Sequence, residues 1–153
     1  MSQHEATISW RRNDEVFTDG KYSRGHSWRF DGGLMVAASA SPHVVRAPFS
    51  IAEAVDPEEA FVASLSSCHM LWFLDFAARA GFVVEAYEDP AVGRMAKNTS
   101  GRLAIVEVVL RPKVVFAGDH QPSAADVASL HHRAHAECFI ANSVKTDVRV
   151  EPR

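Results

Sequence analysis

The segment between Asp56 and Gly81 constrains the fold more than any other part of the sequence. Asp56 is a favourable residue for capping a helix N-terminus, Pro57 suits the first helical position, and Gly81 is typical of the residue that follows a helix. The 24 residues between Asp56 and Gly81 would form a helix about 36 Å long. We therefore expect one long helix near the middle of the chain.

The expected helix is apolar on almost every side, and such a helix is normally buried. Its apolar residues are Phe61, Val62, Leu65, Met70, Leu71, Trp72, Phe73, Leu74 and Phe76. A single domain of 153 residues has difficulty surrounding this helix alone, so we expect a second subunit to cover part of it. Its longest uncharged stretch, residues 60–74, is shorter than the about 20 apolar residues that cross a membrane. We therefore expect no membrane span.

Strand patterns flank this helix in groups. Grouped strands favour an α+β fold over a doubly wound α/β fold, and the length suits one domain over residues 1–153. A second helix is expected over 123–138, where Ser123 and Asp126 resemble a capping box. The expected strands are 7–10, 27–30 and 34–39 before the long helix, 82–88, 91–96 and 103–116 after it, and 144–150 at the end.

Composition narrows the possible functions. The formal charge of −3 argues against general nucleic-acid binding, which needs a basic face. The N-terminus has no apolar signal-peptide core, so we expect a cytoplasmic protein whose thiols are kept reduced. The two cysteines, Cys68 and Cys138, are too few for a disulfide framework.

Each cysteine falls at a core-facing position of an expected helix, and a free cysteine taken alone is more often a small core residue than a reactive one. Cys68, however, lies in an unusually polar patch, Ser64–His69, of an otherwise apolar helix. A reactive thiolate needs a nearby positive charge or hydrogen-bond donor, and the middle of a helix offers no help from the dipole. The charge would have to come from elsewhere, with Arg24 and Arg46 as candidates.

A buried Arg needs a carboxylate partner, and Glu58 and Glu59 are the nearest ones on the helix. Glu58 precedes Cys68 by ten residues, about 15 Å along a straight helix. One Arg therefore cannot easily touch both groups on a straight helix. Either the helix bends, or a second subunit supplies one of the groups.

Two segments resemble the OsmC/Ohr family, named for osmotically inducible protein C and organic hydroperoxide resistance protein. Residues 56–68, Asp-Pro-Glu-Glu-Ala-Phe-Val-Ala-Ser-Leu-Ser-Ser-Cys, are similar to the family's Asn-Pro-Glu motif, whose Glu precedes a helical cysteine by ten residues. Residues 135–138, with the strand expected over 144–150, are similar to the family's second cysteine and closing strand. The resemblance implies an intertwined homodimer with strands grouped around the long buried helix that carries Cys68.

The resemblance also implies a cysteine-based peroxidase acting on organic hydroperoxides. Cys68 would become a sulfenic acid and Cys138 would resolve it as a disulfide. An Arg, for which we favour Arg24 over Arg46, would stabilise the thiolate, and Glu58 would hold that Arg. Phe61, Trp72 and Phe139 would form an apolar site wall. A thiol reductant such as a dihydrolipoyl protein would supply electrons, and no cofactor or metal is implied.

Three other readings stay open. His131, His135 and Cys138 are spaced along one face of the second helix, and with Cys68 and His69 they could bind a metal. A hydrolase could use Cys68 as its nucleophile with His26 or His135 as the base, although a nucleophile in mid-helix lacks an oxyanion hole. The chain could also be a non-catalytic member of the same fold.

Overall fold

In the computed structural model, which describes residues 1–153, the predicted long helix forms as α1 (Pro57–Arg79). A capping box fixes its start, because the backbone N–H of Glu59 donates to Oδ1 of Asp56 at 2.7 Å and that of Asp56 donates to Oε2 of Glu59 at 3.3 Å. Gly81 follows the helix with a φ of 79°, a backbone conformation that suits glycine. Both predicted ends of the helix are therefore confirmed.

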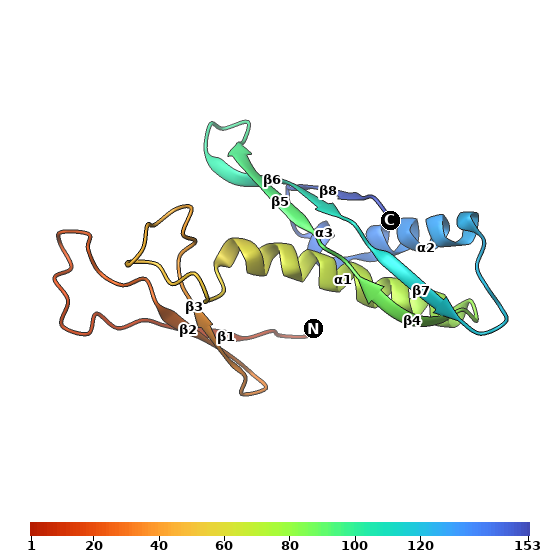
Figure 1. Ribbon diagram of the computed structural model, residues 1–153, viewed down its shortest axis with the longest axis horizontal. Coiled ribbons are helices and arrows are strands. Elements are labelled where there is room, and N and C mark those ends of the chain that lie inside the picture. The colour runs from red at the N-terminus through yellow and green to blue at the C-terminus, as the bar shows by residue number, and fades with distance from the viewer. The chain divides into compact units, whose positions relative to one another are not determined.

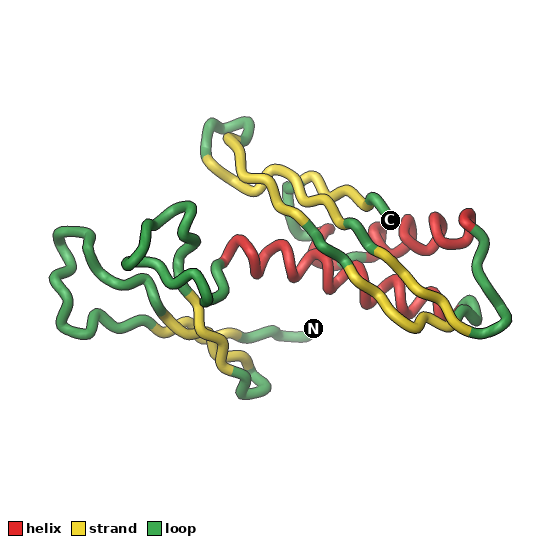
Figure 2. Tube along the Cα trace, in the orientation of Figure 1, coloured by secondary structure: helices red, strands yellow, loops and turns green.

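The chain divides into two units, Met1–Ala60 and Phe61–Arg153. In the first, β1 (Ala6–Ser9), β2 (His26–Phe30) and β3 (Met35–Ala38) form an antiparallel sheet in that order. These strands confirm the three that the sequence predicts before the helix. Figure 2 shows the long loops between β1 and β2 and between β3 and α1 in green.

The second unit holds two small sheets (Figure 1). In one sheet, β4 (Val83–Glu88) pairs antiparallel with β7 (Lys113–Ala117). In the other, β6 (Leu103–Leu110) lies between β5 (Val92–Lys97), its antiparallel neighbour, and β8 (Asp147–Val150), to which it runs parallel. Together with the helices, these sheets confirm the α+β class.

One predicted strand, 103–116, is two strands in the structure. β6 ends at Leu110 and β7 begins at Lys113, and the two belong to different sheets. Pro112, which is buried, lies between them. Proline has no backbone N–H to donate to a ladder, so it marks the point where the chain leaves one sheet for the other.

The second predicted helix forms as α2 (Ala124–Glu137), and its capping box between Ser123 and Asp126 is present. A short helix, α3 (Phe139–Asn142), follows it directly and was not predicted. The expected last strand is shorter than 144–150, because β8 begins only at Asp147.

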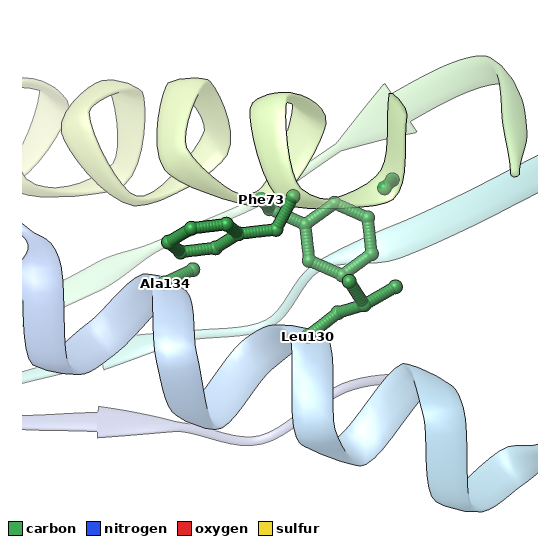
Figure 3. Close-up of a cluster of buried hydrophobic side chains, with 5 residues drawn as sticks. Phe73, Leu130 and Ala134 are labelled. Atoms are coloured by element: carbon green, nitrogen blue, oxygen red, sulfur yellow. The ribbon is translucent and has the colours of Figure 1, made fainter. Parts of the chain in front are cut away.

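The core of the second unit lies between α1 and α2. Figure 3 shows Phe73 of α1 pointing towards Leu130 and Ala134 of α2, all of which are buried. A second cluster joins Leu65 of α1 to Val108 and Leu110 of β6. The opposite side of α1 is less covered by this chain, since Leu71 is 61% exposed.

α1 is also the one helix that is long and apolar enough to cross a membrane. Core helices of water-exposed domains meet the same criterion, and this helix packs Phe73 and Leu65 into the two clusters just described.

β5 approaches α1 closely at Gly93. A Cβ atom at this position would lie 2.6 Å from Cγ2 of Val62, well inside normal contact distance. Because the Val62 side chain is branched at Cβ, it has little freedom to move away. Glycine at position 93 therefore allows the strand and the helix to pack together.

Candidate functional site

The two cysteines meet in the second unit. Cys68 is half-buried on α1, and Cys138, which is 1% exposed, lies between α2 and α3. Both are free thiols, and Cys68 is close enough to Cys138 to affect the pKa of its thiol. The structure thus brings together two residues that are 70 positions apart in the sequence.

The Cys138 thiol holds its proton strongly. Burial, and next the interaction with Cys68, raise its pKa to about 11. At neutral pH, the Cys138 thiol is therefore protonated.

Cys138 is also part of the backbone architecture. Its sulfur accepts a hydrogen bond from the backbone N–H of Ala141 at 3.4 Å, which caps α3. Its own backbone N–H donates to the carbonyl of His135 at 3.4 Å, at the end of α2. The sulfur position is thus fixed by two helix ends rather than by the thiol contact alone.

A buried histidine pair joins His69, the residue after Cys68, to His131 of α2. Nε2 of His69 lies 3.0 Å from Nδ1 of His131, and the two rings are nearly parallel. Burial is the largest cause that lowers the pKa of each ring to about 4; the charges of His131 and His135 add to the effect at His69, while Asp89 opposes it at His131. Both rings are therefore neutral at neutral pH.

The outer nitrogen of each ring has no partner. Nδ1 of His69 and Nε2 of His131 are buried without a hydrogen bond, and so is the hydroxyl of Tyr87. Burial, and then the charge of Asp89, raise the pKa of Tyr87, so this side chain is also neutral. The sequence suggested both histidines as possible metal ligands; in the structure they are buried and contact each other.

No group of three or more His, Cys, Asp or Glu residues is arranged to hold a metal ion. His131, one of the expected ligands, pairs with His69 instead. The arrangement therefore gives no support to the metal-binding alternative.

Arg24 lies in the first unit, in the loop between β1 and β2, and is half-buried. Its Nη1 donates to the carbonyl of Gly20 at 2.8 Å and to that of Tyr22, and the guanidinium carbon lies 3.8 Å from the centre of the Tyr22 ring. Within this unit Arg24 has no ion pair with Glu58, which is half-buried in the first turn of α1. Arg46 is exposed.

His26 and Trp28 hold the backbone of Arg24. The indole N–H of Trp28 donates to Nε2 of His26 at 2.9 Å, so Nε2 is the unprotonated nitrogen. The proton therefore sits on Nδ1, which donates to the carbonyl of Arg24 at 2.8 Å. With both ring nitrogens occupied, His26 is not available as the free base that the hydrolase alternative requires.

A cavity of about 460 Å³ opens beside Arg24 within the first unit. Three aromatic residues line it, and their rings pack against one another: Phe17 stacks on Tyr22 with centroids 4.5 Å apart, and Trp10 meets Tyr22 nearly edge-on at 5.5 Å. Sequence reasoning missed this cavity. The only available signal was three aromatic residues within 13 positions, and they follow neither helical nor strand periodicity.

The predicted apolar wall forms only in part. Trp72 and Phe139 meet edge-to-face with centroids 5.3 Å apart, and Phe139 is 67% exposed. Phe61 packs instead against the cluster of Leu65 and Val108.

The chain resembles known proteins in sequence and in fold. Residues 51–153 match the family model described as OsmC-like protein. The chain belongs to the OsmC-like family. A structure of an OsmC-like protein of unknown function from Vibrio cholerae is 54% identical, has a TM-score of 0.98, and each chain covers 100% of the other. No curated protein sequence matches this chain.

More distant OsmC-like structures share the fold. An organic hydroperoxide resistance protein from Elizabethkingia anophelis is 16% identical with a TM-score of 0.71, covering 99% of this chain and 94% of that one. An organic hydroperoxide resistance protein of Bacillus subtilis is also 16% identical, with a TM-score of 0.67 and coverages of 99% and 98%. The predicted resemblance to the OsmC/Ohr family is thus confirmed.

Proposed function

We propose that this OsmC-like protein is a thiol-dependent peroxidase that reduces organic hydroperoxides. The Cys68 thiolate attacks the outer oxygen of ROOH, the O–O bond breaks, and one proton is taken up to release the alcohol ROH and leave a sulfenic acid on Cys68. The Cys138 thiol then attacks that sulfur, and a disulfide and water are formed. A dithiol reductant then reduces the disulfide between Cys68 and Cys138 to two thiols and is itself oxidised to a disulfide.

The contact between the two thiols carries this proposal. A resolving thiol must reach the sulfenic sulfur, and Cys138 neighbours Cys68 closely enough for Cys68 to affect its pKa. The two residues also differ in exposure. Cys138 is buried and its raised pKa keeps it protonated, while Cys68 is half-buried.

Arg24 is the residue that we propose to stabilise the Cys68 thiolate and to polarise the peroxide. Backbone carbonyls and the Tyr22 ring hold its guanidinium, whereas the alternative, Arg46, is exposed and has no such support. Arg24 has no carboxylate partner in its own unit. We assign Glu58 to orient it, and a homodimer would let a second subunit supply one of these groups.

The remaining parts of the proposal follow from family resemblance and from the exposed apolar residues. We propose an intertwined homodimer, in which a second chain covers Leu71 and Phe139, exposed at 61% and 67%. We further propose that residues 1–153 act as one OsmC-like domain, that the protein works in the cytoplasm, and that a dihydrolipoyl protein is its thiol reductant.

The test of the chemistry uses the reduced protein and stoichiometric cumene hydroperoxide. Intact mass should fall by the mass of two hydrogens as the disulfide forms. The Cys68→Ser variant should not react, and the Cys138→Ser variant should accumulate a sulfenic or over-oxidised Cys68. A thiol that reacts no faster than free cysteine would overturn the proposal.

The assignment of the arginine has its own matched pair. Arg24→Ala should slow oxidation of Cys68, while Arg46→Ala should leave the rate close to that of the unmodified protein. The opposite order would move the role to Arg46.

A further inference from the structure

We propose that the contact between His69 and His131 fixes how α2 lies along α1 and thereby holds Cys138 within reach of an oxidised Cys68. This inference rests on the proposed peroxidase function. It adds two positioning residues to the site and assigns them to the second step, in which the disulfide forms. All four residues belong to the unit Phe61–Arg153.

The histidines and the cysteines occupy linked positions on the two helices. His69 follows Cys68 directly on α1, and His131 of α2 lies seven positions before Cys138. Seven residues are about two helical turns, so His131 and Cys138 lie on the same side of α2. His131 and Cys138 are 4% and 1% exposed, and Ala134 between them is fully buried. The buried side of α2 thus carries the histidine contact at one point and the second thiol two turns further on.

The histidine contact is directional, unlike the packing around it. The surrounding cluster is made of apolar side chains from the two helices: Phe73, Phe76, Ala77, Leu130 and Ala134. Apolar burial is not directional, so it tolerates small shifts of one helix along the other. Nε2 of His69 and Nδ1 of His131, by contrast, lie 3.0 Å apart in nearly parallel rings, and one nitrogen has to donate while the other accepts.

A shift of α2 along α1 would break this contact without replacing it. Both rings are buried, and Nδ1 of His69 and Nε2 of His131 already lack a partner. A shift would leave the two facing nitrogens unpaired as well, where each loses its hydrogen bond and gains none from water. A single buried polar contact can select one register between packed helices in this way.

Disulfide formation needs that register. Cys68 lies close enough to Cys138 to affect its pKa, and a disulfide requires Cβ atoms about 3.5–4.5 Å apart. A shift by one residue would move Cys138 about 1.5 Å along the helix axis. Misplacement of reacting groups by about 1 Å can slow a reaction on the order of 100-fold.

Slow disulfide formation would leave Cys68 open to damage. A sulfenic acid that is not resolved can react with a second hydroperoxide, which transfers its outer oxygen to the sulfur and leaves as an alcohol, so that a sulfinic acid forms. The histidine contact therefore protects Cys68 from over-oxidation by keeping the second step fast.

The test moves the polar atom of each side chain and keeps its chemistry. The amide of Asn can place a polar atom near the position of a histidine Nδ1, and the longer amide of Gln can place one near that of Nε2. His131→Asn and His69→Gln should therefore retain the contact, whereas His131→Gln and His69→Asn should lose it. Because each position has one variant of either kind, loss of the ring alone cannot explain a difference between them.

The measurement follows intact mass with time after reduced protein is mixed with cumene hydroperoxide. It separates the sulfenic acid, with one added oxygen, from the disulfide, which has lost two hydrogens, and from the sulfinic acid, with two added oxygens. We expect His131→Gln and His69→Asn to form the disulfide at least about tenfold more slowly than the unmodified protein and to accumulate sulfinic acid. His131→Asn and His69→Gln should stay close to the unmodified protein.

Two controls complete the experiment. His132→Gln, at an exposed position of α2, should change neither step, and the rate at which the Cys68 thiol is first lost should be the same in every variant. The double variant with leucine at positions 69 and 131 has no unpaired ring nitrogen, so it should fold and still form the disulfide slowly. It keeps the inference testable if a single variant fails to fold.

The outcomes separate the two proposals. Equal rates of disulfide formation in the Asn and Gln variants at each position, or a normal rate in the folded double leucine variant, would overturn the positioning role and leave the peroxidase standing. If the unmodified protein forms neither sulfenic acid nor disulfide, the peroxidase proposal fails, and the positioning role fails with it.

Discussion

His69 and His131 form a buried pair in which Nε2 of the first ring lies 3.0 Å from Nδ1 of the second. The residues come from α1 and α2, so the contact joins the two long helices of the second unit. Phe73 packs against the His131 ring with centroids 4.4 Å apart. The pair is therefore a polar contact enclosed in an aromatic core.

This pair should make the protein sensitive to acid. The pKa of each ring is lowered from 6.5 to about 4 in the folded state, so between these values the unfolded chain binds more protons. The stabilising contribution of the neutral rings is complete above about pH 6.5 and is lost as the pH falls towards 4. Urea unfolding at a series of pH values should show the free energy of unfolding falling across this window.

The control for the acid effect is His132→Ala, at an exposed position of the same helix. This variant should keep the pH dependence, while a variant with both His69 and His131 changed to leucine should largely lose it. A pH dependence that is unchanged in the double variant would contradict the assignment to this pair.

The same residues should couple strongly in a double-mutant cycle. His69→Leu leaves both ring nitrogens of His131 buried without a partner, which costs about 1–3 kcal/mol. His131→Leu does the same to His69, but changing both residues removes every unpartnered nitrogen. Denaturant unfolding should therefore give a double variant that is less destabilised than the sum of the two single variants; additive values would refute the pairing.

The effect of Cys68 on Cys138 should be visible in the titration of Cys138. In Cys68→Ala the midpoint for Cys138 should fall below about 11, because the neighbouring thiol is gone, but stay above the ordinary value of 9.0, because burial is the larger cause. Cys68→Ser keeps a polar hydroxyl beside Cys138 and should keep the midpoint higher. Ultraviolet absorbance of the thiolate measures both, since each variant has one cysteine, and equal midpoints would show that the group at position 68 does not affect Cys138.

Gly93→Ala should destabilise the protein, because the new Cβ would meet Cγ2 of Val62 at 2.6 Å. Overpacking of this kind typically costs about 1–3 kcal/mol. Val62→Ala removes the clashing methyl group. Gly93→Ala should therefore cost less stability in the Val62→Ala variant than in the unmodified protein. Thermal or urea unfolding of the four proteins tests this; no interaction between the two changes would count against the close approach.

The elements whose ends are set locally were predictable. Asp56, Pro57 and Gly81 define α1 through capping and backbone preference, and Ser123 with Asp126 does the same for α2. The split at Pro112 was underestimated, because the alternating residues on both sides read as one strand. Only the assignment of β6 and β7 to different sheets separates them.

The sequence carries a signal for the candidate site only where a motif marks it. Family resemblance links the segment ending in Cys68 to the second cysteine, and in the structure Cys68 lies close enough to Cys138 to affect its pKa. The contact of His69 with His131, 62 residues later, has no such signal, since each histidine alone resembles many surface histidines. The aromatic cavity beside Arg24 depends on the path of a loop, which periodicity does not encode.

Cys138 has a consequence that reaches beyond its thiol. The same sulfur caps α3 through Ala141 and neighbours Cys68, so one atom serves the chain's architecture and the oxidation chemistry that we propose. Any substitution there changes the corner between α2 and α3 together with the thiol pair. The proposed resolving cysteine therefore cannot be moved along the helix without changing the turn that holds it.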